Sequence, residues 1–252
     1  MPTTQMSVPG TVTTMYDSDV IGGQSIYATS AVQKHRLGSR IALPDGRVFY
    51  YAKAGATNLV AGKLCCSPAP VANHTDVTVA AAAAVGDTKL YITIGATSMS
   101  ANQYADGYLH ANANAPAGNY YKIRSHLAIG SSGSGWIHLY DPIQEAFTTS
   151  SKVTLTVNPF NGVVAAATSL TAPVVGVPII DVTASHYFWL QTWGPAAVLT
   201  YGTIVIGQNV GPSGSSAGAV AAVAASTTPV VGFVAHVNGD GEHSLIFLRL
   251  FP

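Results

Sequence analysis

The sequence predicts an all-β protein made of small β-barrel or sandwich modules, with an extended N-terminal arm and little helix. Short segments in which apolar and polar residues alternate recur along the chain, and this period of two is typical of half-buried strands. Turn sequences rich in Gly, Asn and Pro separate these segments at short, fairly regular spacing, as in small barrels and sandwiches. No coiled-coil heptad is present, and helical patterns are scarce.

The chain is short of charge. Only 9% of its 252 residues are charged, against about 25% in an ordinary soluble domain. The 11 acidic residues balance the 11 Lys and Arg, and the densest basic stretch, residues 34–40, is too short for the basic surface that most nucleic-acid-binding proteins carry. The hydrophobic fraction is 48%, yet no apolar run is long enough to cross a bilayer. The composition favours assembly with other subunits over catalysis, nucleic-acid binding or membrane insertion.

Shifts in composition divide the chain into four parts. Residues 1–38 are an extended N-terminal arm, 39–76 a β-hairpin with a proline-punctuated connector, 77–165 a barrel or sandwich domain, and 166–252 a C-terminal β-domain. The arm has too few apolar residues for a core of its own, and its interspersed aromatic residues favour a segment that lies on a neighbouring subunit. Its start lacks the basic and apolar regions of a signal peptide, so synthesis in a cytoplasm is expected.

Three turns position pairs of strands. Asp45-Gly46 predicts the turn of a hairpin, because glycine tolerates the positive φ that tight turns need. Gly86-Asp87 is expected to join two strands of the next block. Asn238–Gly241 predicts a second hairpin, between residues 230–237 and 244–250.

Alternation predicts which side chains face a core. In residues 152–157, Val153, Leu155 and Val157 should point inwards. The strands after residue 166 are mostly apolar on both faces, which indicates that another sheet or another subunit covers them.

Two patterns could carry chemistry. Gly214–Gly218 fits G-x-S-x-G with Ser216 as the nucleophile, but the acid and histidine it needs occur only near the chain's end, and no strand–helix alternation precedes it. A flexible Gly/Ser loop is the simpler interpretation. His236 and His243 flank the second hairpin turn and could approach each other, but two strand residues without a third ligand do not make a metal site.

The two cysteines are neighbours in the chain. Cys65 and Cys66 are expected to stay reduced, because a disulfide between adjacent residues strains the backbone. Two cysteines alone cannot form a disulfide framework, and they are too few to complete the ligands of a zinc site.

The aromatic residues near position 190 are the strongest candidates for contact with another molecule. Alternation places Tyr187, Trp189 and Trp193 on one face of a strand. Such a face can be core or a subunit interface, or a platform on which sugars or nucleobases stack. Trp136 has the same alternatives.

The pattern of segments resembles a known family. After the arm come LPDGRVFYYAKAG, then YADGYLH, GNYYKIRSH, LYDPI and SSKVTLTVNPFNGVV, and the chain closes with VVGVPIIDV, YFWLQTWGPAAVL, VVGFVAHV and SLIFLRLF. This order is similar to that of structural proteins of tailed bacteriophages, in particular the capsid decoration or cement proteins. The resemblance implies a β-rich protein that binds the outside of an icosahedral shell, often as a trimer, and implies no catalytic residues.

The expected function is therefore that of a virion cement protein on the capsid surface, assembled in the host cytoplasm. Its partners would be the major capsid protein and copies of itself, with a homotrimer expected, and no cofactor, metal, nucleic acid or membrane. Alternatives are a tail-tube, head-completion or fibre-associated protein, or a glycan-binding β-module; an enzyme would rest on Ser216 alone. The interface candidates are Tyr16, Ile21, Tyr27, Tyr187, Trp189 and Trp193.

Overall fold

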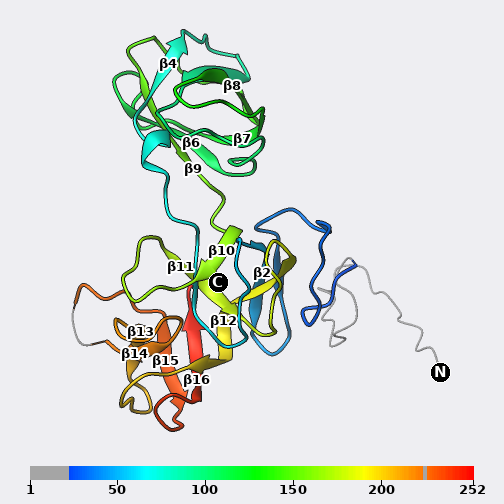
Figure 1. Ribbon diagram of the computed structural model, residues 1–252, viewed down its shortest axis with the longest axis vertical. Helices are drawn as coiled ribbons and strands as arrows, with labels where there is room; N and C mark the ends of the chain where they lie inside the picture. The colour runs from blue at the N-terminus through cyan, green and yellow to red at the C-terminus, as the bar shows by residue number, and fades with distance from the viewer. Residues whose placement is uncertain (1–22, 224–225) are drawn as a thin grey trace, which may run out of the picture.

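The computed structural model describes residues 23–223 and 226–252, which form two β-rich bodies joined by two stretches of chain (Figure 1). The all-β prediction is confirmed: within these two ranges there is no α-helix, and the 3₁₀ segment η1 (Ala72–His74) is the only helical turn. The strands, in chain order, are β1 (Arg40–Ala42), β2 (Val48–Ala54), β3 (Cys65–Cys66), β4 (Val77–Ala81), β5 (Lys89–Thr93), β6 (Tyr108–Ala113), β7 (Tyr120–His126), β8 (Ser134–Leu139), β9 (Lys152–Thr156), β10 (Asn161–Ala165), β11 (Val174–Pro178), β12 (Tyr187–Leu199), β13 (Asn209–Pro212), β14 (Val220–Ala222), β15 (Gly232–His236) and β16 (His243–Arg249).

One body, the upper one in Figure 1, is a closed antiparallel barrel. Its strands follow the order β4-β5-β8-β7-β6-β9, and β4 pairs with β9 to close it, with Val77 opposite Val153. Alternate side chains of each strand fill the interior, as the period of two requires. Val153 and Leu155 are buried and Val157 is packed against the same core, so the predicted inward face of this strand is confirmed.

The other body, the lower one in Figure 1, is built around β12, which is thirteen residues long. We call it the lower body. β12 pairs with β2 and β11 along its first half and with β16 along its second half. On one side β2, β10, β3, β11 and β12 pair in a closed circuit. On the other side β16, β15, β13 and β14 follow β12 in order. A core lies on each side, so β12 is buried over most of its length.

The predicted turns lie where the sequence puts them. Gly46 and Gly86 both have positive φ, at +85° and +95°. They lie between β1 and β2 and between β4 and β5. The C-terminal hairpin is also confirmed, because β15 and β16 pair antiparallel across the turn at 238–241.

The domain boundaries differ from the predicted ones. The hairpin in 39–76 is no separate unit, because β2 pairs with β12. The expected boundary at residue 165 also fails, since β10 (161–165) pairs with β2 and β3 in the lower body. The barrel is thus an insertion between β3 and β10. Alternation predicts strands but not their partners, so it cannot show that β2 pairs with β12 or β10 with β2.

The part of the arm that is described lies on its own chain. Gln24 donates to the carbonyl of Tyr187 at 2.8 Å and accepts from the Tyr51 hydroxyl at 2.7 Å, while Trp189 Nε1 donates to the Gln24 carbonyl at 3.0 Å. Ser30 pairs with Tyr187 as an isolated antiparallel bridge. The expectation that residues 23–30 lie on a neighbouring subunit is therefore wrong. Tyr16 and Ile21 lie outside the described residues.

A small polar cluster connects the two bodies. Arg36 Nη2 donates to the Tyr140 hydroxyl at 2.5 Å, and this hydroxyl donates to Asp106 at 3.1 Å. Asn158 Nδ2, on the second connecting segment, lies 3.2 Å from the carbonyl of Asp106 and 3.4 Å from that of Leu37. Residues of the barrel and of the arm thus meet beside the connecting stretches.

Candidate functional site

The outer surface of β12, β15 and β16 carries a row of aromatic side chains. Val234, Ile246 and Leu248 point to the inner side of this sheet and are fully buried. Because successive side chains of a strand alternate, Phe247 takes the opposite side, and its cross-strand neighbour Phe233 lies beside it. Both phenylalanines are half-buried. The lower body therefore has an apolar core on one side of these strands and aromatic side chains on the other.

Phe247 is the centre of this row. Its ring stacks on Phe233 with centroids 5.2 Å apart, and Trp193 contacts it edge-on at 6.1 Å. Leu245, two residues earlier on β16, is 41% exposed, and Arg249 Cζ lies 4.4 Å from the centroid of Phe233. We call Trp193, Phe233, Leu245 and Phe247 the aromatic face. Aromatic residues and Arg are enriched where proteins contact one another.

The predicted cluster around position 190 is divided by a bulge. The pairing of β12 with β2 shifts register between Gln191 and Trp193, and a shift by one residue moves side chains to the other face of a strand. Trp189 is 1% exposed and packs with Tyr51 in a core. The prediction that Trp189 and Trp193 share a face is wrong, and Trp189 is a core residue of its own chain, not a contact residue.

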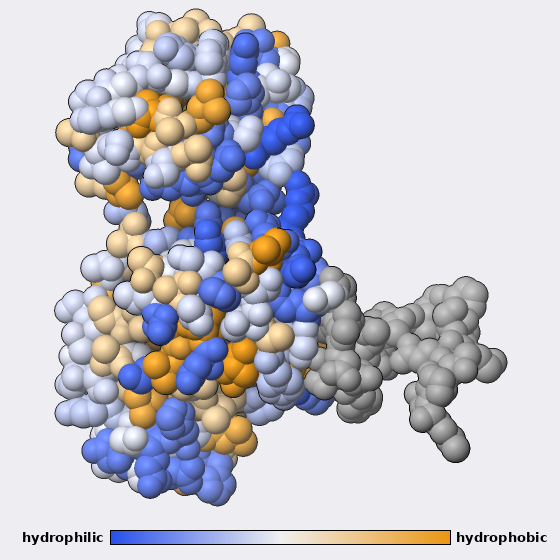
Figure 2. Space-filling model, turned by 45° about the vertical axis from the view of Figure 1, so that its right-hand side comes forward, coloured by the Kyte–Doolittle hydropathy of each residue, from blue (hydrophilic) through white to orange (hydrophobic). Residues whose placement is uncertain are grey.

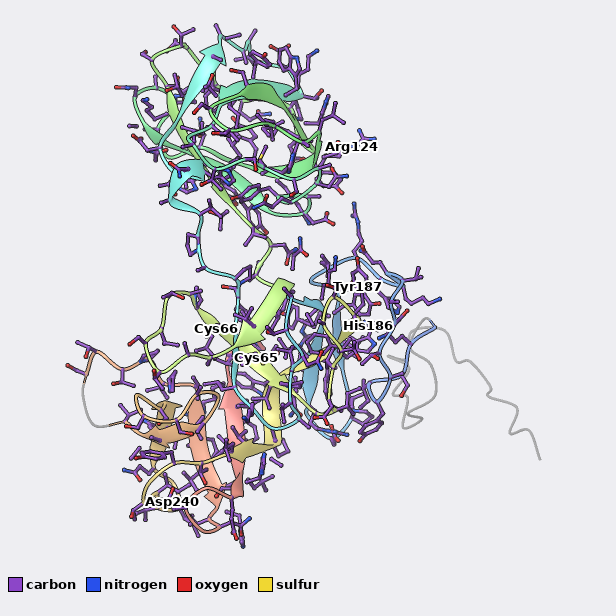
Figure 3. All side chains as sticks on the ribbon, viewed as in Figure 1. Cys65, Cys66, Arg124, His186, Tyr187 and Asp240 are labelled. Carbon is purple, nitrogen blue, oxygen red and sulfur yellow. The ribbon has the colours of Figure 1, made fainter. Side chains whose placement is uncertain are left out.

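The remaining interface candidates are partly accessible. Tyr187 is half-buried, and its ring stacks on Tyr51 with centroids 6.0 Å apart. Figure 3 shows its position at the side of the lower body next to the arm. Tyr27 is 55% exposed. Of the three aromatic residues proposed from β12, Trp193 is the one that lies in the aromatic face.

A second surface cluster lies on the barrel. Trp136 on β8 is 43% exposed and lies opposite Tyr91 on β5, with ring centroids 4.8 Å apart. Lys89 Nζ lies 4.4 Å from the centroid of the Trp136 ring. The sequence singled out Trp136, and the structure adds the two neighbours on β5.

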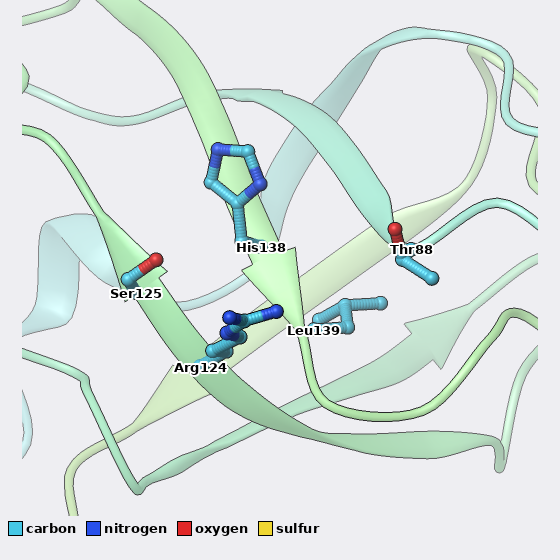
Figure 4. Close-up of a pocket in the computed structure, with 5 residues that line it drawn as sticks. All are labelled: Thr88, Arg124, Ser125, His138 and Leu139. Atoms are coloured by element: carbon cyan, nitrogen blue, oxygen red, sulfur yellow. The ribbon is translucent and has the colours of Figure 1, made fainter.

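A pocket of about 180 Å³ opens beside Lys89, whose cross-strand partner His138 lines it. Figure 4 shows the side chains that line it, which come from β7, β8 and the residue before β5: Thr88, Arg124, Ser125, His138 and Leu139. The lining is mostly polar. Sequence analysis missed this pocket, because no motif joins residues 88, 124 and 138 and only strand pairing brings them together.

The candidate chemical motifs are not assembled into a reactive site in the described residues. Ser216 lies in the loop between β13 and β14, where the Ser213 hydroxyl accepts from the backbone N–H of Ser215 and Ser216 at 3.1 Å each. A strand, not a helix, follows the motif. His236 and His243 are both exposed. Across the described ranges, no group of three or more His, Cys, Asp or Glu residues is placed to hold a metal ion.

The two cysteines are free and buried on β3, in the interior of the lower body (Figure 3). Cys65 packs into one core of that body and Cys66 into the other, because adjacent strand residues point to opposite faces. Burial raises the pKa of both thiols, that of Cys66 to about 11. Neither is a thiolate at neutral pH, so they act as small core residues.

Two buried histidines of the barrel, His74 and His126, share one hydrogen-bond network with Tyr104. The Tyr104 N–H donates to His126 Nε2 at 3.0 Å, so His126 Nδ1 carries the proton and donates to the Leu127 carbonyl at 2.9 Å. His74 Nε2 donates to the Thr97 carbonyl at 3.0 Å, and its Nδ1 lies 2.6 Å from the Tyr104 hydroxyl. Burial lowers the pKa of His126 and raises that of Tyr104 to about 12. This network satisfies buried polar groups and has a structural role.

Comparisons with known proteins give no relative. No protein-family model, no curated protein and no solved structure matches the chain. Of the helical segments in residues 23–223 and 226–252, none has the length and apolar character needed to span a membrane.

Proposed function

We propose that this chain is a virion structural protein that binds the outer surface of an icosahedral capsid and stabilises it, as a cement or decoration protein does. Its partners in this proposal are the major capsid protein and copies of itself in a homotrimer. The observation that carries the proposal is the aromatic face on β12, β15 and β16. Apolar side chains that gather on a protein surface mark candidate sites of interaction.

The surface of the lower body supports the same interpretation. Hydrophobic side chains gather on part of it, between hydrophilic ones (Figure 2). The charge content of 9% leaves little electrostatic repulsion between copies. In a closed ring of identical contacts, each aromatic face would be covered by a neighbour. Many copies on one shell would then multiply a modest contact energy through avidity.

Binding to shells tests the proposal directly. Capsid shells assembled without this chain are mixed with the purified protein and sedimented. We expect the chain to pellet with the shells and to raise the temperature at which they rupture. Phe247→Asp should abolish both effects, because it puts a charge into the water-excluding contact between copies, and a separated chain lacks the avidity of the ring. Leu127→Asp, at an 82% exposed position on the barrel, is the matched control and should bind as the wild type does.

The alternatives predict other locations. An antibody against the purified chain should label the heads of native particles. Label confined to tails or fibres, together with no binding to shells, would overturn the cement proposal in favour of a tail-tube, head-completion or fibre-associated protein.

A further inference from the structure

The barrel carries a surface with the components of a sugar-binding site. Trp136 presents a half-exposed indole with Tyr91 beside it. The faces of aromatic rings carry partial negative charge and attract the weakly positive C–H groups of a pyranose. Lys89 lies over the Trp136 ring, but its side chain is exposed and can move aside for a ligand.

The pocket beside this platform supplies groups that recognise an anion. Arg124 and His138 line it, and Ser125 and Thr88 add hydroxyl groups. Neither the Arg124 guanidinium nor the His138 ring makes a hydrogen bond or ion pair to any residue in the described ranges. A guanidinium binds a carboxylate through two parallel hydrogen bonds, so a free Arg124 in a polar pocket fits a carboxylate.

The platform and the pocket belong to one surface. Trp136 and His138 are two residues apart on β8, so their side chains leave the same face of the strand about 7 Å apart. At about 180 Å³, the pocket is smaller than the roughly 300–1,000 Å³ of sites that enclose a whole small-molecule ligand. It can take one substituent, while the rest of the ligand lies outside on the indole.

The balanced charge of the barrel favours a sugar over a nucleic acid as the ligand. In residues 77–157 four acidic residues balance four basic ones: Asp87, Asp106, Asp141 and Glu145 against Lys89, Lys122, Arg124 and Lys152. A nucleic-acid strand requires a basic groove that follows its phosphates. A balanced barrel with one cationic pocket fits a ligand that carries a single anionic group per sugar unit.

We propose that the outer surface of β5, β7 and β8 binds an acidic glycan, with a pyranose ring stacked on Trp136 and its carboxylate held by Arg124 in the adjacent pocket. The ligand class is a carboxylated sugar, either a uronic acid or a sialic acid. This proposal is independent of the capsid proposal, because it concerns the barrel and not the aromatic face.

Calorimetric titration of the full-length protein tests the proposal with four sugar probes and one nucleic-acid probe. Trigalacturonic acid and sialyllactose represent the two acidic sugars, and galactotriose and lactose are their neutral counterparts. We expect one of the acidic probes to bind at least tenfold more tightly than its neutral counterpart. Whichever acidic probe binds identifies the source of the carboxylate. An oligothymidylate serves as the nucleic-acid probe and should bind more weakly than the preferred sugar.

Variants connect binding to the named residues. Trp136→Ala should weaken binding about tenfold or more, since loss of one stacking partner costs that much in other aromatic platforms. Arg124→Gln, at an exposed position, should remove the preference for the acidic probe and leave weak binding to the neutral one. Tyr120→Ala is the matched control, because Tyr120 is a 70% exposed aromatic residue elsewhere on the same barrel, and it should bind as the wild type does.

Three results would overturn the inference. They are no binding of either acidic probe at millimolar concentration, equal binding by the wild type and Arg124→Gln, and tighter binding of the oligothymidylate than of any sugar. None of these results bears on sedimentation with shells, so failure here is distinguishable from failure of the capsid proposal.

Discussion

Leu248 shows how a single residue of β16 holds the lower body together. It is fully buried and packs with Ile246 and Val234 in the core on the inner side of the sheet. Leu248→Ala should lower the free energy of unfolding by about 2–5 kcal/mol, the usual cost of a large-to-small change in a core. Denaturant unfolding measures the loss. Leu170→Ala, at an exposed position in the same body, should change it by less than about 0.5 kcal/mol, and an equal loss in both variants would contradict this account of the core.

His126 should make the stability of the barrel depend on pH. Burial lowers its pKa in the folded state, whereas in the unfolded chain the pKa is about 6.5. Below about pH 6.5 the unfolded chain binds a proton at this residue that the folded barrel does not bind. The free energy of unfolding therefore falls as the pH falls. Unfolding monitored between pH 7.5 and pH 5 measures the slope.

A pair of variants tests whether His126 causes this slope. His126→Gln should be less stable than the wild type at pH 7.5 but should lose less stability on acidification. His138→Gln, at an exposed position on the same barrel, should keep the wild-type slope. If His126→Gln keeps the full slope too, the buried ring is not its source.

At the scale of the elements, the barrel should fold without the lower body. It is an insertion with its own closed strand circuit and its own core. A fragment of residues 71–158 should therefore unfold cooperatively, with a thermal midpoint close to that of the barrel in the whole protein. Circular dichroism and calorimetry of the fragment check this. A fragment without a cooperative transition would show that the barrel depends on contacts such as those between Arg36, Tyr140 and Asp106.

The sequence predicts the strands better than the way they pair. The hairpins at Asp45-Gly46 and at 238–241 are local, and turn chemistry together with alternation is enough to find them. The pairing of β2 with β12 joins segments more than a hundred residues apart, and no local pattern encodes it. Two features of the candidate sites cannot be predicted for the same reason. They are the bulge that separates Trp189 from Trp193 and the pocket formed by residues from three separate segments.

At the scale of the whole molecule, the two bodies have separate roles in the proposals. The lower body carries the aromatic face and would make the contacts of assembly. The barrel, which projects from it on two connecting segments (Figure 1), would stay accessible and present the platform at Trp136. This division explains why a chain with so few charges would need to associate: the apolar surface of one body would be covered by copies of itself.

Sedimentation equilibrium of the purified protein at micromolar concentration tests self-association through the aromatic face most directly. We predict a mass three times that of one chain, unchanged by high salt, because screening weakens ion pairs but not apolar contacts. Trp193→Asp should reduce the mass to that of one chain, while Lys34→Ala, a change at an exposed position of the arm, should leave the trimer intact. A wild-type protein with the mass of a single chain, or a Trp193→Asp variant that remains trimeric, would contradict the account.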